Sequence, residues 1–162
     1  MADSTPLTSG ARYVYGQAKP VDVPIDTATA VVKGDIVCIS SGKCVPATAF
    51  ATKALAAAAF LGIAAQSKDA GVAQIRGNGK ANTIVVNTGG FFAIPCVDAC
   101  DVTDKVGIKL NGGATAALAN EVSKTATANE QIGVVAEIKT ASESHVVVEI
   151  FPKVFGPRSI LV

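Results

Sequence analysis

FLGIAA at residues 60–65 and QIGVVA at residues 131–136 are two versions of one phrase, and they decide how the chain is interpreted. A Lys-x-Ala tail begins three residues after each version. Upstream, VKGDIV at residues 32–37 corresponds to VTDKV at residues 102–106. The offset of about 70 residues is too long for a solenoid unit. Two copies in one chain therefore predict a single barrel or sandwich built from two pseudo-equivalent halves.

The composition is that of one globular domain. With 162 residues, of which 49% are apolar and 17% charged, the chain is long enough to bury a real core. The formal net charge of +1 gives no field that would attract nucleic acid or an anionic membrane. Tryptophan is absent, which argues against base-stacking platforms and aromatic-lined ligand pockets.

Short apolar runs separated by Gly and Asn turns predict an all-β domain over residues 21–151. Such strands at short spacing are typical of a sandwich or a barrel. Residues 47–59 are rich in alanine and are left open between a loop and a short helix capped by Thr48. The polar stretch at residues 119–130 is predicted to be a loop.

Both ends of the chain are predicted to be extended arms, over residues 1–20 and 152–162, because Pro and Gly interrupt any regular pattern there. In the first arm the candidate partner-contact residues are Arg12, Tyr13, Val14 and Tyr15. Arg and Tyr are favoured at the centres of interfaces, where they bring large area and a polar tip. The alternative is an ordinary disordered terminus.

Four cysteines are present, and the N-terminus lacks the apolar stretch of a secretory signal, so we expect free thiols in a reducing compartment. A three-residue hairpin loop at residues 40–42 would place Cys38 opposite Cys44, as a cross-strand thiol pair. In an oxidising medium such a pair could form a disulfide. The alternative is two small buried side chains.

Cys96 and Cys100 are weak candidates for metal ligands. Their C-x3-C spacing falls within the range of zinc ligands, but no second ligand pair follows at a finger-like distance. The sequence also shows no catalytic set. His145 is the only histidine, and Gly-Lys at residues 42–43 lacks both the first glycine and the hydroxyl of a phosphate loop. We therefore expect no enzymatic activity and no cofactor.

The phrases VxxGDIV, FLGIAAxxKDAG, GGFFAIP, LNGG, IGVVAE and VVVEI, in this order, resemble the small capsid decoration (cement) proteins of tailed bacteriophages. The resemblance covers about residues 28–151 and is carried by the order and number of the phrases. It implies a non-catalytic, all-β virion protein on the outer surface of the head. It also implies binding to the major capsid protein, self-association as a dimer or trimer, and synthesis in the host cytoplasm. The family has sometimes been labelled as recombinases. Because the sequence lacks a complete phosphate-binding loop, it gives that label no support.

On this interpretation the domain stabilises the capsid by bridging major capsid protein subunits, and residues 1–20 reach onto neighbouring subunits. Two alternatives remain open. One is a small-ligand- or metal-binding β-barrel with Cys96, Asp98, Cys100 and Asp101 at its mouth. The other is a phage fibre or adhesin subunit whose arms drive self-polymerisation.

Overall fold

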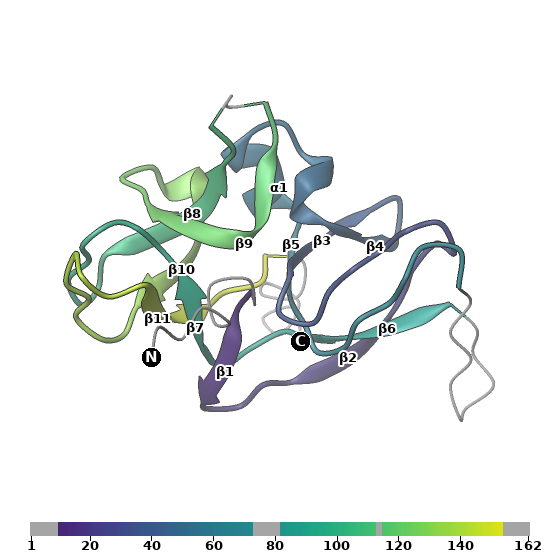
Figure 1. Cartoon of the computed structure of the whole chain (residues 1–162), viewed down its shortest axis with the longest axis horizontal. Coiled ribbons are helices and arrows are strands. Elements are labelled where there is room, and N and C mark those ends of the chain that lie inside the picture. The colour runs from purple at the N-terminus through teal and green to yellow at the C-terminus, as the bar shows by residue number, and fades with distance from the viewer. Residues whose placement is uncertain (1–9, 73–81, 113–114, 154–162) are drawn as a thin grey trace, which may run out of the picture.

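The Val-rich runs form strands because β-branched side chains fit a pleated, half-buried surface. The computed structural model describes residues 10–72, 82–112 and 115–153 (Figure 1). Its strands are β1 (Arg12–Tyr15), β2 (Pro20–Pro24), β3 (Ile36–Ser40), β4 (Lys43–Pro46), β5 (Phe60–Ala64), β6 (Thr83–Asn87), β7 (Phe91–Pro95), β8 (Lys105–Leu110), β9 (Ala117–Lys124), β10 (Gln131–Val135) and β11 (His145–Ile150). In β11 the buried residues alternate with half-buried ones, as the sequence pattern predicts. The predicted all-β class is confirmed.

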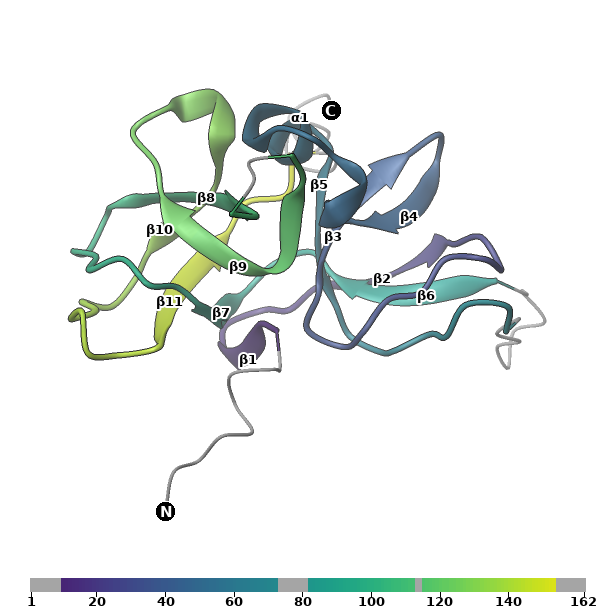
Figure 2. The ribbon, with the colours of Figure 1, turned by 45° about the horizontal axis from the view of Figure 1, so that its top comes forward.

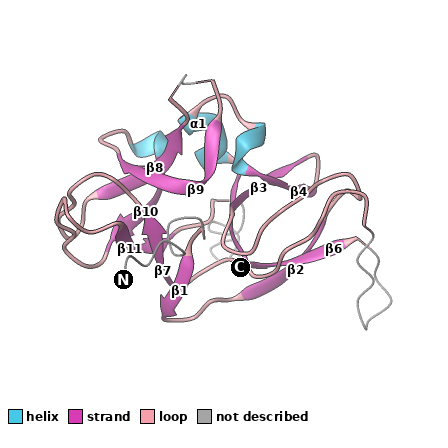
Figure 3. Ribbon diagram, in the orientation of Figure 1, coloured by secondary structure: helices cyan, strands magenta, loops and turns pink. Residues whose placement is uncertain are grey.

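The strands form two antiparallel sheets in a sandwich-like arrangement. One sheet has six strands in the order β1-β7-β11-β10-β8-β9, and the other has five in the order β2-β6-β5-β3-β4. Figures 1 and 2 show the two sheets side by side, with the five-stranded sheet on the right in both views. The helical segments are α1 (Lys53–Ala58) and the short 3-10 turns η1 (Ala47–Ala49) and η2 (Ala128–Glu130), which Figure 3 distinguishes from the strands.

We call the five-stranded sheet the first sheet and the six-stranded sheet the second, in chain order. The strand order of the first sheet recurs in the second. Strands β2 to β6 have the order β2-β6-β5-β3-β4, and strands β7 to β11 have the equivalent order β7-β11-β10-β8-β9. The register also recurs, since Val37 pairs with Gly62 and Val106 pairs with Gly133. The repeated unit is thus a whole five-stranded sheet, and it begins at β2, earlier than the repeated phrase itself.

The glycine of the repeated phrase is required by a close approach between strands. A Cβ atom on Gly62 would lie 2.1 Å from the carbonyl oxygen of Asn87, and one on Gly133 would lie 2.4 Å from that of Glu149. No side chain can be placed at such distances without moving a backbone. Ile-Gly-Val and its variant Leu-Gly-Ile therefore mark the same crowded point in both sheets.

Of the barrel and the sandwich that the sequence left open, the structure is sandwich-like and not a closed barrel, because neither sheet closes on itself in the described part of the chain. In the first sheet only an isolated bridge between Ile25 and Cys44 joins the two edges. Ile25 donates its N–H toward β6, so the alternation of the strand turns Pro20 and Pro24 toward the outer edge, where proline offers no N–H. In the second sheet β1 occupies the outer edge of β7, so β7 cannot also pair with β9.

The core consists of two clusters. The smaller one lies on one face of the first sheet and contains Val23, Ile25, Val31, Val37, Cys44, Leu61, Ala64, Ile84 and Val86. The larger one fills the second sheet, and residues from the other face of the first sheet, including Ile36, Phe60 and Ile63, join it. This larger cluster is what holds the two sheets together.

Two connections differ from expectation. Residues 47–59 contain the short helix α1, but its N-cap is Thr52, whose Oγ1 accepts a hydrogen bond from the Leu55 N–H at 3.2 Å, and Thr48 lies in η1. Residues 119–130, predicted to be a loop, instead belong largely to β9 and η2, because the polar residues of β9 pair with β8 at the sheet edge. Residues 73–81 of the predicted all-β domain lie outside the described residues.

Candidate partner-binding surface

The four candidate contact residues lie together on β1, at the edge of the six-stranded sheet. Arg12 pairs with Ala93, Tyr13 with Phe92 and Tyr15 with Phe91, with a register shift between the two tyrosines. All four residues of β1 are exposed. The arm predicted over residues 1–20 therefore contains a strand of the sheet, while residues 1–9 lie outside the described residues.

The register shift places the two tyrosines on different aromatic neighbours. The ring of Tyr13 meets that of buried Phe92 edge to face, with centroids 5.8 Å apart and planes at 71°. The ring of Tyr15 stacks on that of Phe91, with centroids 4.4 Å apart and planes at 21°. Such aromatic pairs add to the stabilisation from buried area alone. Although Tyr13 and Tyr15 are 47% and 40% exposed, both rings are held in place.

The hydroxyl groups fix the two tyrosines further. The Tyr13 hydroxyl donates to the carbonyl oxygen of Gly16 at 2.6 Å, and the Tyr15 hydroxyl donates to Oε1 of Glu137 at 3.4 Å. Partial desolvation, followed by the charge of Glu137, raises the pKa of Tyr15 above its ordinary value of 10.0. Because the rings are already oriented, a partner would immobilise little side-chain freedom on binding here.

The chain on both sides of β1 is tied to the first sheet and its connections. The Ala11 N–H donates to the carbonyl oxygen of Gly34 at 2.7 Å. After β1, the carbonyl oxygen of Lys19 accepts hydrogen bonds from the N–H of Thr88 at 3.1 Å and from its Oγ1 at 2.8 Å. Residues 10–19 thus connect both sheets, which the interrupted Pro and Gly pattern alone does not predict.

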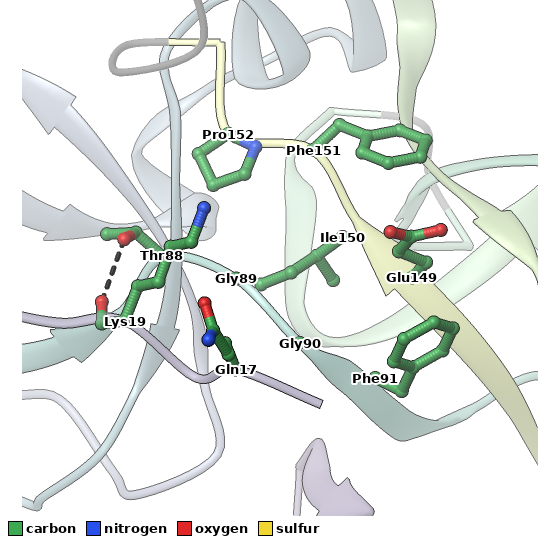
Figure 4. A pocket seen from close by; sticks show the side chains of 10 residues that line it. All are labelled: Gln17, Lys19, Thr88, Gly89, Gly90, Phe91, Glu149, Ile150, Phe151 and Pro152. Carbon is green, nitrogen blue, oxygen red and sulfur yellow. Dashed lines mark hydrogen bonds between the residues drawn. The ribbon is translucent and has the colours of Figure 1, made fainter. Parts of the chain in front are cut away.

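A cavity of about 500 Å³ adjoins this surface. In Figure 4, Phe91, Glu149 and Phe151 follow one another along one side of it, with Gln17 and Lys19 on the other. Phe91 links the two features, because its ring both lines the cavity and stacks on Tyr15. We call Arg12, Tyr13, Val14, Tyr15 and Phe91 the β1 surface.

The predicted cross-strand pair of Cys38 and Cys44 is not formed. The turn has two residues, Ser41 and Gly42, both with positive φ, so Cys44 pairs with Ile39 and not with Cys38. A shift of one residue moves a side chain to the other face of a sheet. Cys38 accordingly belongs to the larger core cluster and Cys44 to the smaller one. Burial raises the pKa of both thiols to about 12.

The weak metal candidates, Cys96 and Cys100, do come together. Their Sγ atoms lie 3.8 Å and 3.6 Å from the carbonyl oxygen of Asp98, which also accepts a hydrogen bond from Nζ of Lys139 at 2.9 Å. Within the described residues, no group of three or more His, Cys, Asp or Glu side chains gathers as metal ligands. Asp101 takes another role, since its N–H donates to Oδ2 of Asp104 at 2.8 Å in the following turn.

Two buried lysines were not singled out as sites by the sequence patterns. Lys68 and Lys139 are each only 2% exposed. Nζ of Lys68 donates to the carbonyl oxygens of Thr27, Thr29 and Asp69 at 2.8–3.1 Å. The signal that could have found them is their identical place in the Lys-x-Ala tails of the repeat.

The described residues contain no helix long and apolar enough to cross a membrane. Comparison with protein families, with curated proteins and with solved structures gives no match for this chain.

Proposed function

We propose that the chain is a structural, non-catalytic virion protein that binds the outer surface of a bacteriophage head and stabilises the capsid. In this role it bridges subunits of the major capsid protein, and it acts as a dimer or trimer. The order of the repeated phrases, which resembles that of capsid decoration proteins, supports the proposal. Many copies on a symmetric shell would gain from effective concentration, so each copy can bind modestly.

The observation that carries the proposal is the β1 surface. It presents two tyrosines and Arg12, the residue types that dominate binding energy at interfaces, on an exposed sheet edge. Stacking and hydrogen bonds hold both rings before any partner arrives. A rigid aromatic patch of this kind suits a protein whose work is to bury surface against a repeating partner.

The direct test of the function is copy number in purified virions of the source phage. The band of this mass is quantified against the major capsid protein. We expect hundreds of copies, on the order of the number of shell subunits. A few copies would indicate a tail, portal or fibre component, and absence from the virion would overturn the proposal.

The role of the β1 surface is tested with purified protein and heads that lack it. Val14→Asp adds a charge to an exposed residue of β1, and the matched control Leu55→Asp does the same on α1, where Leu55 is 57% exposed. We expect Val14→Asp to weaken head binding by about 30-fold, which corresponds to about 2 kcal/mol, and Leu55→Asp to leave it unchanged. Equal affinity of the two variants would contradict the role of β1.

The contribution of the N-terminal residues is tested separately by removing residues 1–9. Removal of residues 1–19 would also delete β1 and uncover Phe91 and Phe92, so it would mix a folding defect with a binding defect. We expect the shorter truncation to fold and to decorate heads more weakly. Normal occupancy of heads by this truncation would confine the contact to the β1 surface.

A further inference from the structure

At one pair of equivalent buried positions, the first half has two hydrocarbon side chains and the second half has two cysteines. Cys96 occupies the place of Ile25, since Ile25 donates its N–H to Asn82 just as Cys96 donates to Ser144. Cys100 occupies the place of Val31, since Val31 forms a bridge with Lys68 and Cys100 forms the equivalent bridge with Lys139. The first half fills both positions with hydrocarbon, so packing alone does not require thiols in the second half.

The second half also brings these positions closer along the chain. Five residues separate Ile25 from Val31, whereas three separate Cys96 from Cys100. Both thiols lie within 3.8 Å of one carbonyl oxygen, that of Asp98. By contrast, Cys38 and Cys44 lie on opposite faces of their sheet.

A cavity lies beside one of the two cysteines. A cavity of about 360 Å³ is lined by Cys96 together with Pro95, Val97, Glu121 and Ser144. Cys96 is itself only 2% exposed, and burial raises the pKa of its thiol to about 11, so we expect its reaction with a small reagent to be slow at neutral pH. Cys100 is not among the residues that line this cavity.

We propose that Cys96 and Cys100 are a thiol pair that small disulfides, such as oxidised glutathione, convert to an intrachain disulfide. The Cys96 thiolate attacks one sulfur of the reagent, which forms a mixed disulfide and releases one small thiol. The Cys100 thiolate then attacks the Cys96 sulfur and releases the second small thiol. The two cysteines lose two protons and two electrons, and the reagent is reduced to two thiols. This inference does not rest on the proposed function.

The test uses the full-length protein, folded and fully reduced, treated with oxidised glutathione. Trypsin cleavage after lysine and arginine then places Cys96 and Cys100 in one peptide, residues 81–105, and Cys38 and Cys44 in two others, residues 34–43 and 44–53. We expect the peptide of residues 81–105 to lose about 2 Da while the other two stay reduced. The number of titratable thiols should fall from four to two.

Two controls keep the result specific to the fold. The same treatment in denaturant should also oxidise Cys38 and Cys44, because the two faces of the sheet no longer separate them. Cys100→Val, which copies the residue of the first half, should stop at the mixed disulfide, with a gain of about 305 Da on the peptide of residues 81–105. A native peptide of residues 81–105 that stays reduced, or one that keeps glutathione without closing, would overturn the proposal.

Discussion

The two sheets are alike on their inner faces and different on their outer faces. Inward, Val37 and Leu61 of the first sheet correspond to Val106 and Ile132 of the second, and all four are fully buried. This shared face is what makes the repeated phrase visible in the sequence. It shows that each half forms a curled sheet around apolar residues at the same register positions.

Outward, the equivalent positions diverge. Phe60 of the first sheet is fully buried and corresponds to half-buried Gln131 of the second. Ile36, also buried, corresponds to exposed Lys105. The outer face of the first sheet packs into the core of the second, whereas the corresponding face of the second sheet meets solvent. The outer face of the first sheet thus packs against the second half, whereas the polar outer face of the second sheet has no third sheet to cover it in the described part of this chain.

The largest expected effect on stability comes from exchanging Phe60 and its counterpart Gln131. We expect Phe60→Gln to lower the free energy of unfolding by about 4 kcal/mol, because it removes a buried ring and buries an amide without partners. The reciprocal change, Gln131→Phe, should cost less than about 1 kcal/mol, because Gln131 is half-buried at the surface. Urea unfolding of both variants measures the difference. Similar losses in the two variants would contradict the one-way packing.

The two buried lysines, Lys68 and Lys139, occupy equivalent positions in the two halves but donate to different numbers of carbonyl oxygens. Nζ of Lys68 is held by three carbonyl oxygens and that of Lys139 by two, those of Asp98 and Thr140. Replacing either lysine with methionine removes these charge-assisted hydrogen bonds, and only the carbonyl oxygen of Thr29 then lacks any other donor among those named. We expect a loss of about 3 kcal/mol for Lys68→Met and about 2 kcal/mol for Lys139→Met, measured by the same unfolding experiment. The reverse ranking would show that the number of carbonyl partners does not set the stabilisation.

Much of the fold could be predicted because local sequence patterns determine it. The short apolar runs and the Gly and Asn turns between them predicted the all-β class. The repeated phrase predicted two halves because its glycines sit where a backbone passes within contact distance. The apolar runs and turns depend on neighbours in the sequence, whereas each glycine is required by steric exclusion from the adjacent strand.

The rest depended on pairings that no local pattern records. Whether the turn at Ser41 and Gly42 has two or three residues changes the face on which Cys44 lies, and both options fit the sequence. Likewise, residues 12–15 form a strand only because β7 offers an edge whose Phe91 and Phe92 contact the rings of the two tyrosines. Tertiary context decides both cases, and the candidate surface with them.

The glycines of the repeated phrase test whether the two sheets share one geometry. We expect Gly62→Ala and Gly133→Ala to destabilise the protein by similar amounts, about 2 kcal/mol each, because each new methyl group would overlap a carbonyl oxygen of the neighbouring strand. Gly42→Ala is a useful contrast, because a Cβ there meets no atom within 4 Å and only the positive φ opposes it. Thermal unfolding of the three variants makes the comparison. A neutral Gly133→Ala would show that the equivalence of the sheets fails at this point.

The smallest effect concerns the only histidine. His145 pairs with Pro95 as Thr83 pairs with Pro24, so the two are equivalent. Burial, followed by the charges of Arg12 and Lys139, lowers the pKa of His145 below its ordinary 6.5. The unfolded chain therefore takes up a proton more readily than the folded protein as the pH falls below about 6.5.

The stability that neutral His145 contributes is therefore complete above about pH 6.5 and is lost as the pH falls toward the lower pKa of the folded state. We expect the wild type to lose a small part of its unfolding free energy between pH 7.5 and pH 5.5. His145→Thr, which copies Thr83, should remove that slope. Urea unfolding at both pH values measures the effect, and an equal slope in the variant would assign it to other groups. The pH dependence is then a property of the second half alone, since the first half has no titratable side chain at this position.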